Sequence, residues 1–123
     1  MSLRTPLSEA KGLGSAKEGV SHWWMQRLTA IALVPLAIWF VFAVAMLGDA
    51  SYATIVGWLQ SPIVTVFLVL FIIATFYHTQ LGLQVIVEDY VGGWMKVVSL
   101  ILISFLCIVS ALAGIIALLK ISL

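Results

Sequence analysis

Residues 28–47 decide the fold: they read LTAIALVPLAIWFVFAVAML and contain no charged side chain. At a rise of about 1.5 Å per residue, a helix of this length crosses the roughly 30 Å hydrocarbon core of a bilayer. Two further long apolar stretches follow, at residues 62–87 and 97–119. Strands of a membrane barrel are about ten residues long and alternate in polarity, unlike these segments. The sequence therefore predicts an all-α integral membrane protein with three transmembrane helices.

The composition around these spans agrees with a membrane location. Hydrophobic residues make up 63% of the chain and charged residues only 9%, whereas a soluble domain carries about a quarter charged residues. The net charge is +1 and the basic residues are scattered, so no nucleic-acid partner is expected. Residues 1–20 contain Pro6, mixed charges and no apolar core. We expect them to be a polar extension, neither a signal peptide nor an Arg-rich transit peptide, ahead of a membrane domain at 21–123.

Lys and Arg side chains are distributed unevenly between the two sides of the predicted membrane. The first connection, residues 48–61, has none, and the second connection has Lys96. Because basic residues gather on the cytoplasmic side, we expect the N-terminus and the second connection there and the C-terminus in the periplasm. A bacterial inner membrane is expected rather than a mitochondrial inner membrane. Four of the six basic residues precede the first span: Arg4, Lys11, Lys17 and Arg27.

His78 is the side chain inside the predicted spans with the strongest functional potential. An ionisable group at membrane depth is costly and marks a candidate functional site. Gly82 lies four residues further on, on the same helix face, and leaves a gap in which a flat macrocycle can lie beside the imidazole. From its chemistry alone His78 fits three roles: an axial ligand of haem iron, a hydrogen bond between two helices, or a proton relay.

An acidic residue and a phenol, Asp89 and Tyr90, follow eleven and twelve residues after His78. Eleven residues make about three helical turns, so Asp89 is expected on the same face, about 16 Å along the axis. The Tyr90 phenol is able to donate a hydrogen bond to a carbonyl oxygen, and the carboxylate is able to hold or pass a proton. The alternative is an aromatic anchor beside charges that end a helix.

Several other polar residues have simpler interpretations. Arg27 precedes the first span, and its two-pronged guanidinium suits carboxylates such as haem propionates, but it also fits an orientation-setting charge that reaches the headgroups. His22 is expected to meet only solvent or lipid, and Gln80 and Gln84 to contact a neighbouring helix. Cys107 is the single cysteine. It is expected to be a small buried apolar residue, because one thiol does not hold an iron–sulfur cluster.

Three spans, the sequence HWWMQRLTA at residues 22–30, and the spacing from His78 to Asp89 and Tyr90 resemble the D-type hydrophobic anchor subunits of succinate dehydrogenase. The resemblance implies that His78 is an axial ligand of haem b, with the iron's second histidine supplied by a partner anchor subunit. It implies that Tyr90 hydrogen-bonds a carbonyl oxygen of ubiquinone and that Asp89 supports this quinone site. Gly82 would then pack against the haem.

The same resemblance implies the function and the partners. The chain would be the membrane anchor of a succinate:ubiquinone oxidoreductase (respiratory complex II), which passes electrons from succinate to quinone. Arg27 would lie near the haem propionates or the quinone pocket. A flavoprotein subunit and an iron–sulfur subunit would dock on the cytoplasmic face. The chain has no dinucleotide-binding fingerprint, so no catalytic residue for succinate oxidation is expected within it.

Three alternatives stay open at the level of sequence. The first is a fumarate reductase anchor, which runs the reaction in the other direction. The second is a cofactor-free structural or assembly subunit of a respiratory complex, in which His78 only joins two helices. The third is a small proton-coupled transporter, which is less favoured because no Asp or Glu lies within a predicted span.

Overall fold

The computed structural model describes residues 6–7 and 16–123, and the elements discussed below lie in the second range. The chain is built from four helices there: α2 (Ala16–Leu47), α3 (Tyr52–Leu59), α4 (Pro62–Tyr90) and α5 (Trp94–Ser122). Strands are absent from these described residues. Three stretches of 29 residues are long and apolar enough to cross a membrane: Gly19–Leu47, Pro62–Tyr90 and Trp94–Ser122. The predicted all-α membrane fold with three spans is confirmed.

The spanning helices are longer than the apolar stretches that predict them. α4 begins at Pro62 as expected, with Ser61 as N-cap, because proline suits the first helical position. α2 begins at Ala16, twelve residues before Leu28, since interfacial Trp and Arg side chains continue a helix beyond the hydrocarbon core. Most of the predicted polar extension, residues 1–20, lies outside the described residues, and its final residues already belong to α2.

The expected first connection contains a short helix, α3, that the sequence does not predict. It has eight residues, too few to span a bilayer. The hydroxyl of Ser51 caps it by accepting from the backbone N–H of Thr54 at 3.3 Å. The Gln60 side-chain amide, just after α3, donates to the Ile121 carbonyl at 3.3 Å. This end of the molecule is therefore tied together by α3 and the C-terminal turn of α5.

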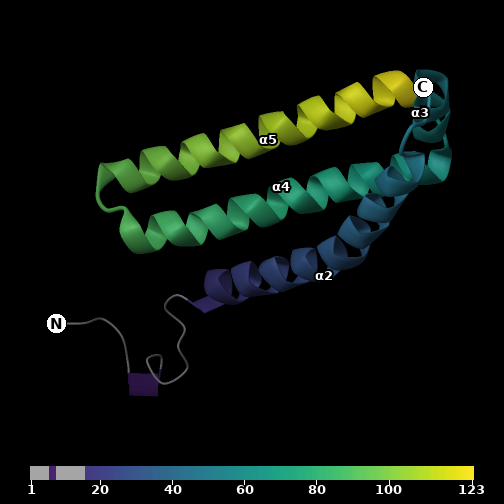
Figure 1. Ribbon diagram of the computed structural model, residues 1–123. Coiled ribbons are helices and arrows are strands. Elements are labelled where there is room, and N and C mark those ends of the chain that lie inside the picture. The colour runs from purple at the N-terminus through teal and green to yellow at the C-terminus, as the bar shows by residue number, and fades with distance from the viewer. Residues whose placement is uncertain (1–5, 8–15) are drawn as a thin grey trace.

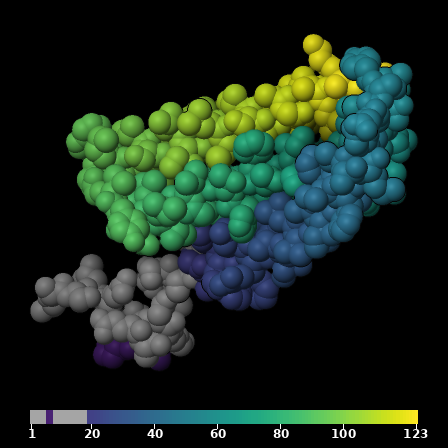
Figure 2. Space-filling model, viewed as in Figure 1, coloured from purple at the N-terminus to yellow at the C-terminus, as the bar shows by residue number. Residues whose placement is uncertain are grey.

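The three long helices lie side by side, with α4 between α2 and α5 (Figure 1). In the space-filling view they form successive bands, and α3 stands across their shared end (Figure 2). α2 changes direction along its length (Figure 1) and contains Pro35. A proline inside a helix removes one backbone hydrogen bond and bends the axis. α4 is thus the central helix and has a separate neighbour on each side.

Few side chains are buried in this row of helices. A small core of Val64, Leu68 and Leu118 lies near α3. Cys107 is also buried, at 8% exposure, as predicted for a small apolar residue. Most large apolar side chains of the three spans are exposed, and water is a poor neighbour for such a surface. A membrane location explains this exposure, because lipid is an apolar neighbour for these faces.

Candidate functional site: a polar seam between α2 and α4

Polar side chains of α2 face His78 of α4 across the contact between these two helices. On α2 they are spaced four and three residues apart, which places them on one helix face. Hydrogen bonds connect two of them with α4, and the third approaches a glycine of α4. We call this contact the polar seam and define it by His22, Gln26, Thr29, His78 and Gly82.

The centre of the seam is a hydrogen bond between His78 and Thr29. The His78 Nδ1 atom lies 2.9 Å from the Thr29 Oγ1 atom. Thr29 is the most deeply buried polar residue of the described chain, with 7% of its surface exposed. His78 itself is half-buried and lies near the middle of α4. The imidazole is therefore turned toward α2, near the middle of a helix long and apolar enough to span a membrane.

The seam continues for two turns toward the N-terminal end of α2. The Nε2 atom of His22 lies 3.2 Å from the carbonyl oxygen of Leu81, so the imidazole donates to the backbone of α4. The prediction that His22 meets only solvent or lipid is wrong, because α2 begins early enough to pack this residue against α4. A Cβ atom on Gly82 would lie 3.8 Å from the Gln26 amide nitrogen, so Gly82 faces α2 beside His78.

Two oxygen atoms near His78 are buried without a hydrogen-bond partner among the described residues. They are Gln26 Oε1, across the seam, and Thr75 Oγ1, one turn before His78 on α4. An unpaired buried polar atom costs about 1–3 kcal/mol. Groups from outside this chain, such as a ligand or another subunit, would remove that cost by donating to these oxygens.

The donor set at the seam fits a haem that takes one axial ligand from this chain. His78 uses only Nδ1 for a hydrogen bond among the described residues, which leaves Nε2 for iron. Over the same residues no group of three or more His, Cys, Asp or Glu side chains is placed to hold a metal ion alone. In a haem the macrocycle provides most of the iron ligands, so a single histidine is a sufficient contribution.

α4 continues unbroken from His78 to Tyr90. Asp89 therefore lies about three turns, or roughly 16 Å, beyond His78 along one helix, as the spacing predicts. Tyr90 is 85% exposed at the last position of α4. Gln84 donates to Glu88 within α4 at 2.9 Å, and its contact with a neighbouring helix stays a prediction. The Tyr90 phenol and the Asp89 carboxylate are therefore both exposed at the end of α4.

Arg27 lies on the side of α2 that faces away from the polar seam. Its guanidinium carbon is 5.5 Å from the centroid of the Trp23 ring, a cation–π distance. The residue is exposed. The first half of α2 and the turn between α4 and α5 lie toward the same end of the molecule (Figure 1). Arg27 lies two residues before Thr29, which meets His78, so it is closer to the level of His78 than to that of Tyr90, and its predicted contact with propionates or quinone stays a prediction.

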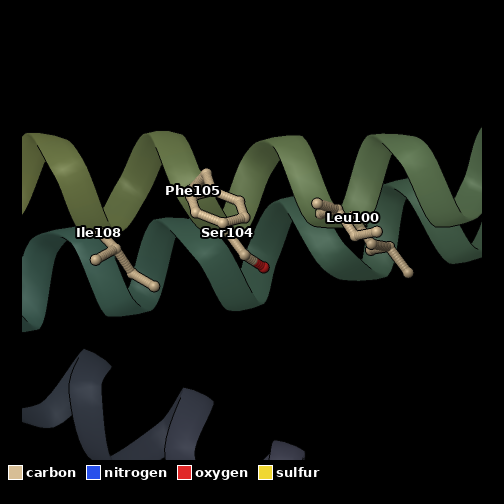
Figure 3. A pocket seen from close by; sticks show the side chains of 5 residues that line it. Leu100, Ser104, Phe105 and Ile108 are labelled. Atoms are coloured by element: carbon tan, nitrogen blue, oxygen red, sulfur yellow. The ribbon is translucent and has the colours of Figure 1, made fainter.

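The opposite face of α4 makes two side-chain hydrogen bonds with α5, and one of them, between the Thr65 and Ser122 hydroxyls at 2.6 Å, lies at the end near α3. The Gln80 amide donates to the Ser104 hydroxyl at 3.0 Å, as predicted for a residue that contacts a neighbouring helix. A shallow hollow of about 280 Å³ lies at the same level of α5 (Figure 3). None of the seam residues lines this hollow, so it is separate from the candidate site. Its lining is Leu100, Ile101, Ser104, Phe105 and Ile108.

Sequence reasoning misses Gln26 and Thr29 as members of the site. A threonine inside an apolar span has no distinctive signal of its own. The available signal is the spacing of His22, Gln26 and Thr29, which marks one polar face at the start of an otherwise apolar helix.

The fold and the site together define a class: a three-helix membrane subunit with one histidine held in a polar helix contact at mid-membrane depth. A comparison with known protein families identifies the family within this class. Residues 1–117 match the family described as "Succinate dehydrogenase/Fumarate reductase transmembrane subunit". The chain belongs to this family, as the resemblance predicts.

Individual relatives agree with this assignment. The chain is 37% identical, over 72% of its length and 71% of the relative's, to the succinate dehydrogenase hydrophobic membrane anchor subunit of Rickettsia bellii. It is 32% identical to the subunit of the same name from Paracoccus denitrificans, over 79% of this chain and 75% of the other. The succinate dehydrogenase membrane anchor subunit of Reclinomonas americana is 34% identical, over 75% and 80% respectively.

Proposed function

We propose that this chain is the hydrophobic membrane anchor of a succinate:ubiquinone oxidoreductase, that His78 ligates haem b, and that Tyr90 forms part of the ubiquinone site. One observation carries the proposal. His78 is held near the middle of a spanning helix by a single ring nitrogen, and the acid–phenol pair ends the same helix. The names of the relatives support the anchor role.

Each residue has a defined task in this proposal. His78 offers Nε2 to the iron, and the bound haem supplies one-electron redox chemistry near the quinone. The Tyr90 phenol donates a hydrogen bond to a quinone carbonyl oxygen. Asp89 holds or passes the protons that quinone reduction takes up. Arg27 pairs with propionate or quinone oxygens, and Gly82 leaves room for the flat face of the macrocycle.

The proposal also includes partners and an orientation. A second anchor subunit supplies the other axial histidine, since this chain presents one histidine at that depth. An iron–sulfur subunit and a flavoprotein subunit dock at the end that holds Tyr90. Lys96, at the start of α5, is a basic residue at this end, and Arg27 lies in the first half of α2, which begins on the same side. The positive-inside tendency therefore supports a cytoplasmic location for it, in a bacterial inner membrane.

A cofactor-free structural subunit is the second candidate, and the His78–Thr29 hydrogen bond favours it. Such a bond joins two helices without any ligand, and stabilises the contact by roughly 0.6–2 kcal/mol. The two candidates differ in the use of Nε2, which only a haem-binding subunit needs. A fumarate reductase anchor stays a third candidate, because the family description includes both directions of the reaction.

Replacing each of the two histidines of the seam separates these candidates. The complex containing this chain would be purified in detergent, as wild type and as the His78→Ala and His22→Ala variants. Both substitutions remove a histidine that bonds across the seam. Reduced-minus-oxidised spectra are expected to show a b-type signal in the wild type and in His22→Ala, and a strongly reduced signal in His78→Ala.

Two outcomes would contradict the proposal. A b-type signal of equal size in His78→Ala would remove His78 from the iron site. An assembled wild-type complex without any b-type signal would favour the cofactor-free structural subunit. The identity of the co-purifying subunits gives an independent result, because a flavoprotein and an iron–sulfur protein are expected beside a second membrane chain.

A further inference from the structure

The hydroxyl of Thr29 has three possible hydrogen-bond partners. It lies 2.8 Å from the Met25 carbonyl oxygen, 3.0 Å from the Gln26 carbonyl oxygen and 2.9 Å from His78 Nδ1. Both carbonyl oxygens only accept hydrogen bonds, and a threonine hydroxyl has a single hydrogen. The hydroxyl hydrogen is therefore directed back to its own helix, and the Thr29 oxygen is left with lone pairs toward His78.

This arrangement determines the hydrogen on the imidazole. A neutral histidine carries one ring N–H, and the other nitrogen has a lone pair. The oxygen of Thr29 accepts, so Nδ1 carries the hydrogen and donates at 2.9 Å. Nε2 is then the unprotonated nitrogen. The bond from α2 thus fixes both the tautomer and the rotation of a side chain that belongs to α4.

We propose that Thr29 is a positioning residue for His78, which holds the ring in the tautomer that presents a bare Nε2 to iron. The inference rests on the proposed function, because it assumes that His78 ligates haem. An acceptor for the second ring N–H of a ligating histidine orients the ring and raises the basicity of the nitrogen that binds metal. A more basic ligand stabilises ferric iron relative to ferrous iron, so the Thr29 hydroxyl lowers the haem midpoint potential.

The burial of Thr29 strengthens its effect on His78. With 7% of its surface exposed, the residue is shielded from solvent, and a hydrogen bond is stronger in such surroundings than in water. Water is excluded from the membrane core, so no solvent molecule replaces the hydroxyl readily when it is removed. Loss of the hydroxyl would leave the Nδ1 hydrogen of His78 without its acceptor.

Three substitutions at Thr29 test this inference in the purified complex. Thr29→Val replaces the hydroxyl with a methyl group and keeps the shape of the side chain. Thr29→Ala removes the hydroxyl and puts no group in its place, and Thr29→Ser retains the hydroxyl. We expect Val and Ala to shift the haem reduction equilibrium about tenfold toward the reduced form, which corresponds to an upward shift of about 59 mV for one electron. Thr29→Ser is expected to stay at the wild-type potential. Redox titration of the b-type absorbance measures all three.

Thr79 provides the matched control. It follows His78 directly, is exposed, and its hydroxyl donates only to the Thr75 carbonyl of its own helix, at 2.7 Å. Thr79→Val therefore removes the same chemical group beside His78 without touching the imidazole. Its haem potential and the electron paramagnetic resonance spectrum of its ferric haem are expected to match the wild type, whereas both change in Thr29→Val.

The outcomes separate this inference from the proposed function. If Thr29→Val and Thr29→Ala retain the wild-type potential and spectrum while His78→Ala loses the haem, Thr29 has no positioning role and the haem assignment stands. If Thr29→Val does not assemble, Thr29→Ala decides the question. An equal shift in Thr79→Val and Thr29→Val would show a general helix effect and overturn the inference. Retention of the haem by His78→Ala overturns both proposals.

Discussion

The two faces of α4 make different contacts with their neighbours. Toward α2, the contact contains the polar seam, in which hydrogen bonds join His22 and Thr29 to α4. Toward α5, the contact is mainly close apolar packing, in which Gly114 lies against the side chain of Ile72. Two side-chain hydrogen bonds, Gln80–Ser104 and Thr65–Ser122, are the polar contacts on that side. The α2 face of α4 thus contains the candidate site, and the α5 face is packed mainly through apolar side chains.

The difference follows from the surroundings of a membrane helix. Apolar burial gives little advantage in lipid, so helices associate through small residues that permit close approach. Gly114 of α5 is such a small residue, and the branched side chain of Ile72 in α4 packs against it. A polar residue at the same depth is costly unless it is bonded, and it persists where a ligand or a function uses it. We therefore expect substitutions on the α5 side to affect stability, and substitutions on the α2 side to affect the site.

The largest expected effect on stability lies at Gly114. An added Cβ would lie 3.5 Å from Ile72 Cδ1, an ordinary contact, so Gly114→Ala is expected to be tolerated. Gly114→Leu adds atoms beyond that contact and separates α4 from α5. We expect a loss of about 3 kcal/mol, the upper end for overpacking, seen as a lower denaturation midpoint of the purified complex. An unchanged midpoint would contradict the close α4–α5 contact.

The next effect concerns the exposed end of α4. Tyr90→Phe removes the phenol that the proposed quinone site needs, and we expect about a tenfold fall in succinate–quinone activity, or about 1.4 kcal/mol. Succinate oxidation with an artificial acceptor that takes electrons upstream should not change.

Tyr52 is a suitable control for Tyr90. It begins α3 at the other end of the molecule and is nearly as exposed, at 84% compared with 85%. Tyr52→Phe is expected to retain both activities. Equal losses in the two assays for Tyr90→Phe, or equal quinone defects in the two variants, would remove the quinone role from Tyr90.

The sequence predicts the three spans better than it predicts the seam. Length and polarity give the three spans, and the position of His78 follows from them. The three spanning helices are predicted too short at their ends, because interfacial residues such as Trp23 continue a helix beyond the strongly apolar stretch. α3 is missed because eight residues are too few for a span.

Thr29 is missed for a different reason. A threonine in the run LTAIALV is a neutral feature of a membrane helix. Its role depends on the register between α2 and α4, which places it 2.9 Å from His78 although 49 residues separate the two in the chain. The helical period predicts which α2 residues share a face, but hydropathy does not predict which residue of α4 that face meets.

The smallest effect tests whether the Gln80–Ser104 contact on the α5 side is only structural. Gln80→Leu removes the amide that donates to Ser104 at 3.0 Å, and we expect a loss of about 0.6 kcal/mol, the average for such bonds between membrane helices. Ser104→Ala and the double variant complete the cycle, and the double variant should be no less stable than Gln80→Leu alone. Gln80 is two residues from His78, so the haem potential is the decisive measurement. A potential equal to the wild type keeps the two faces of α4 separate, whereas a shift as large as that of Thr29→Val would mean that α5 also acts on the site.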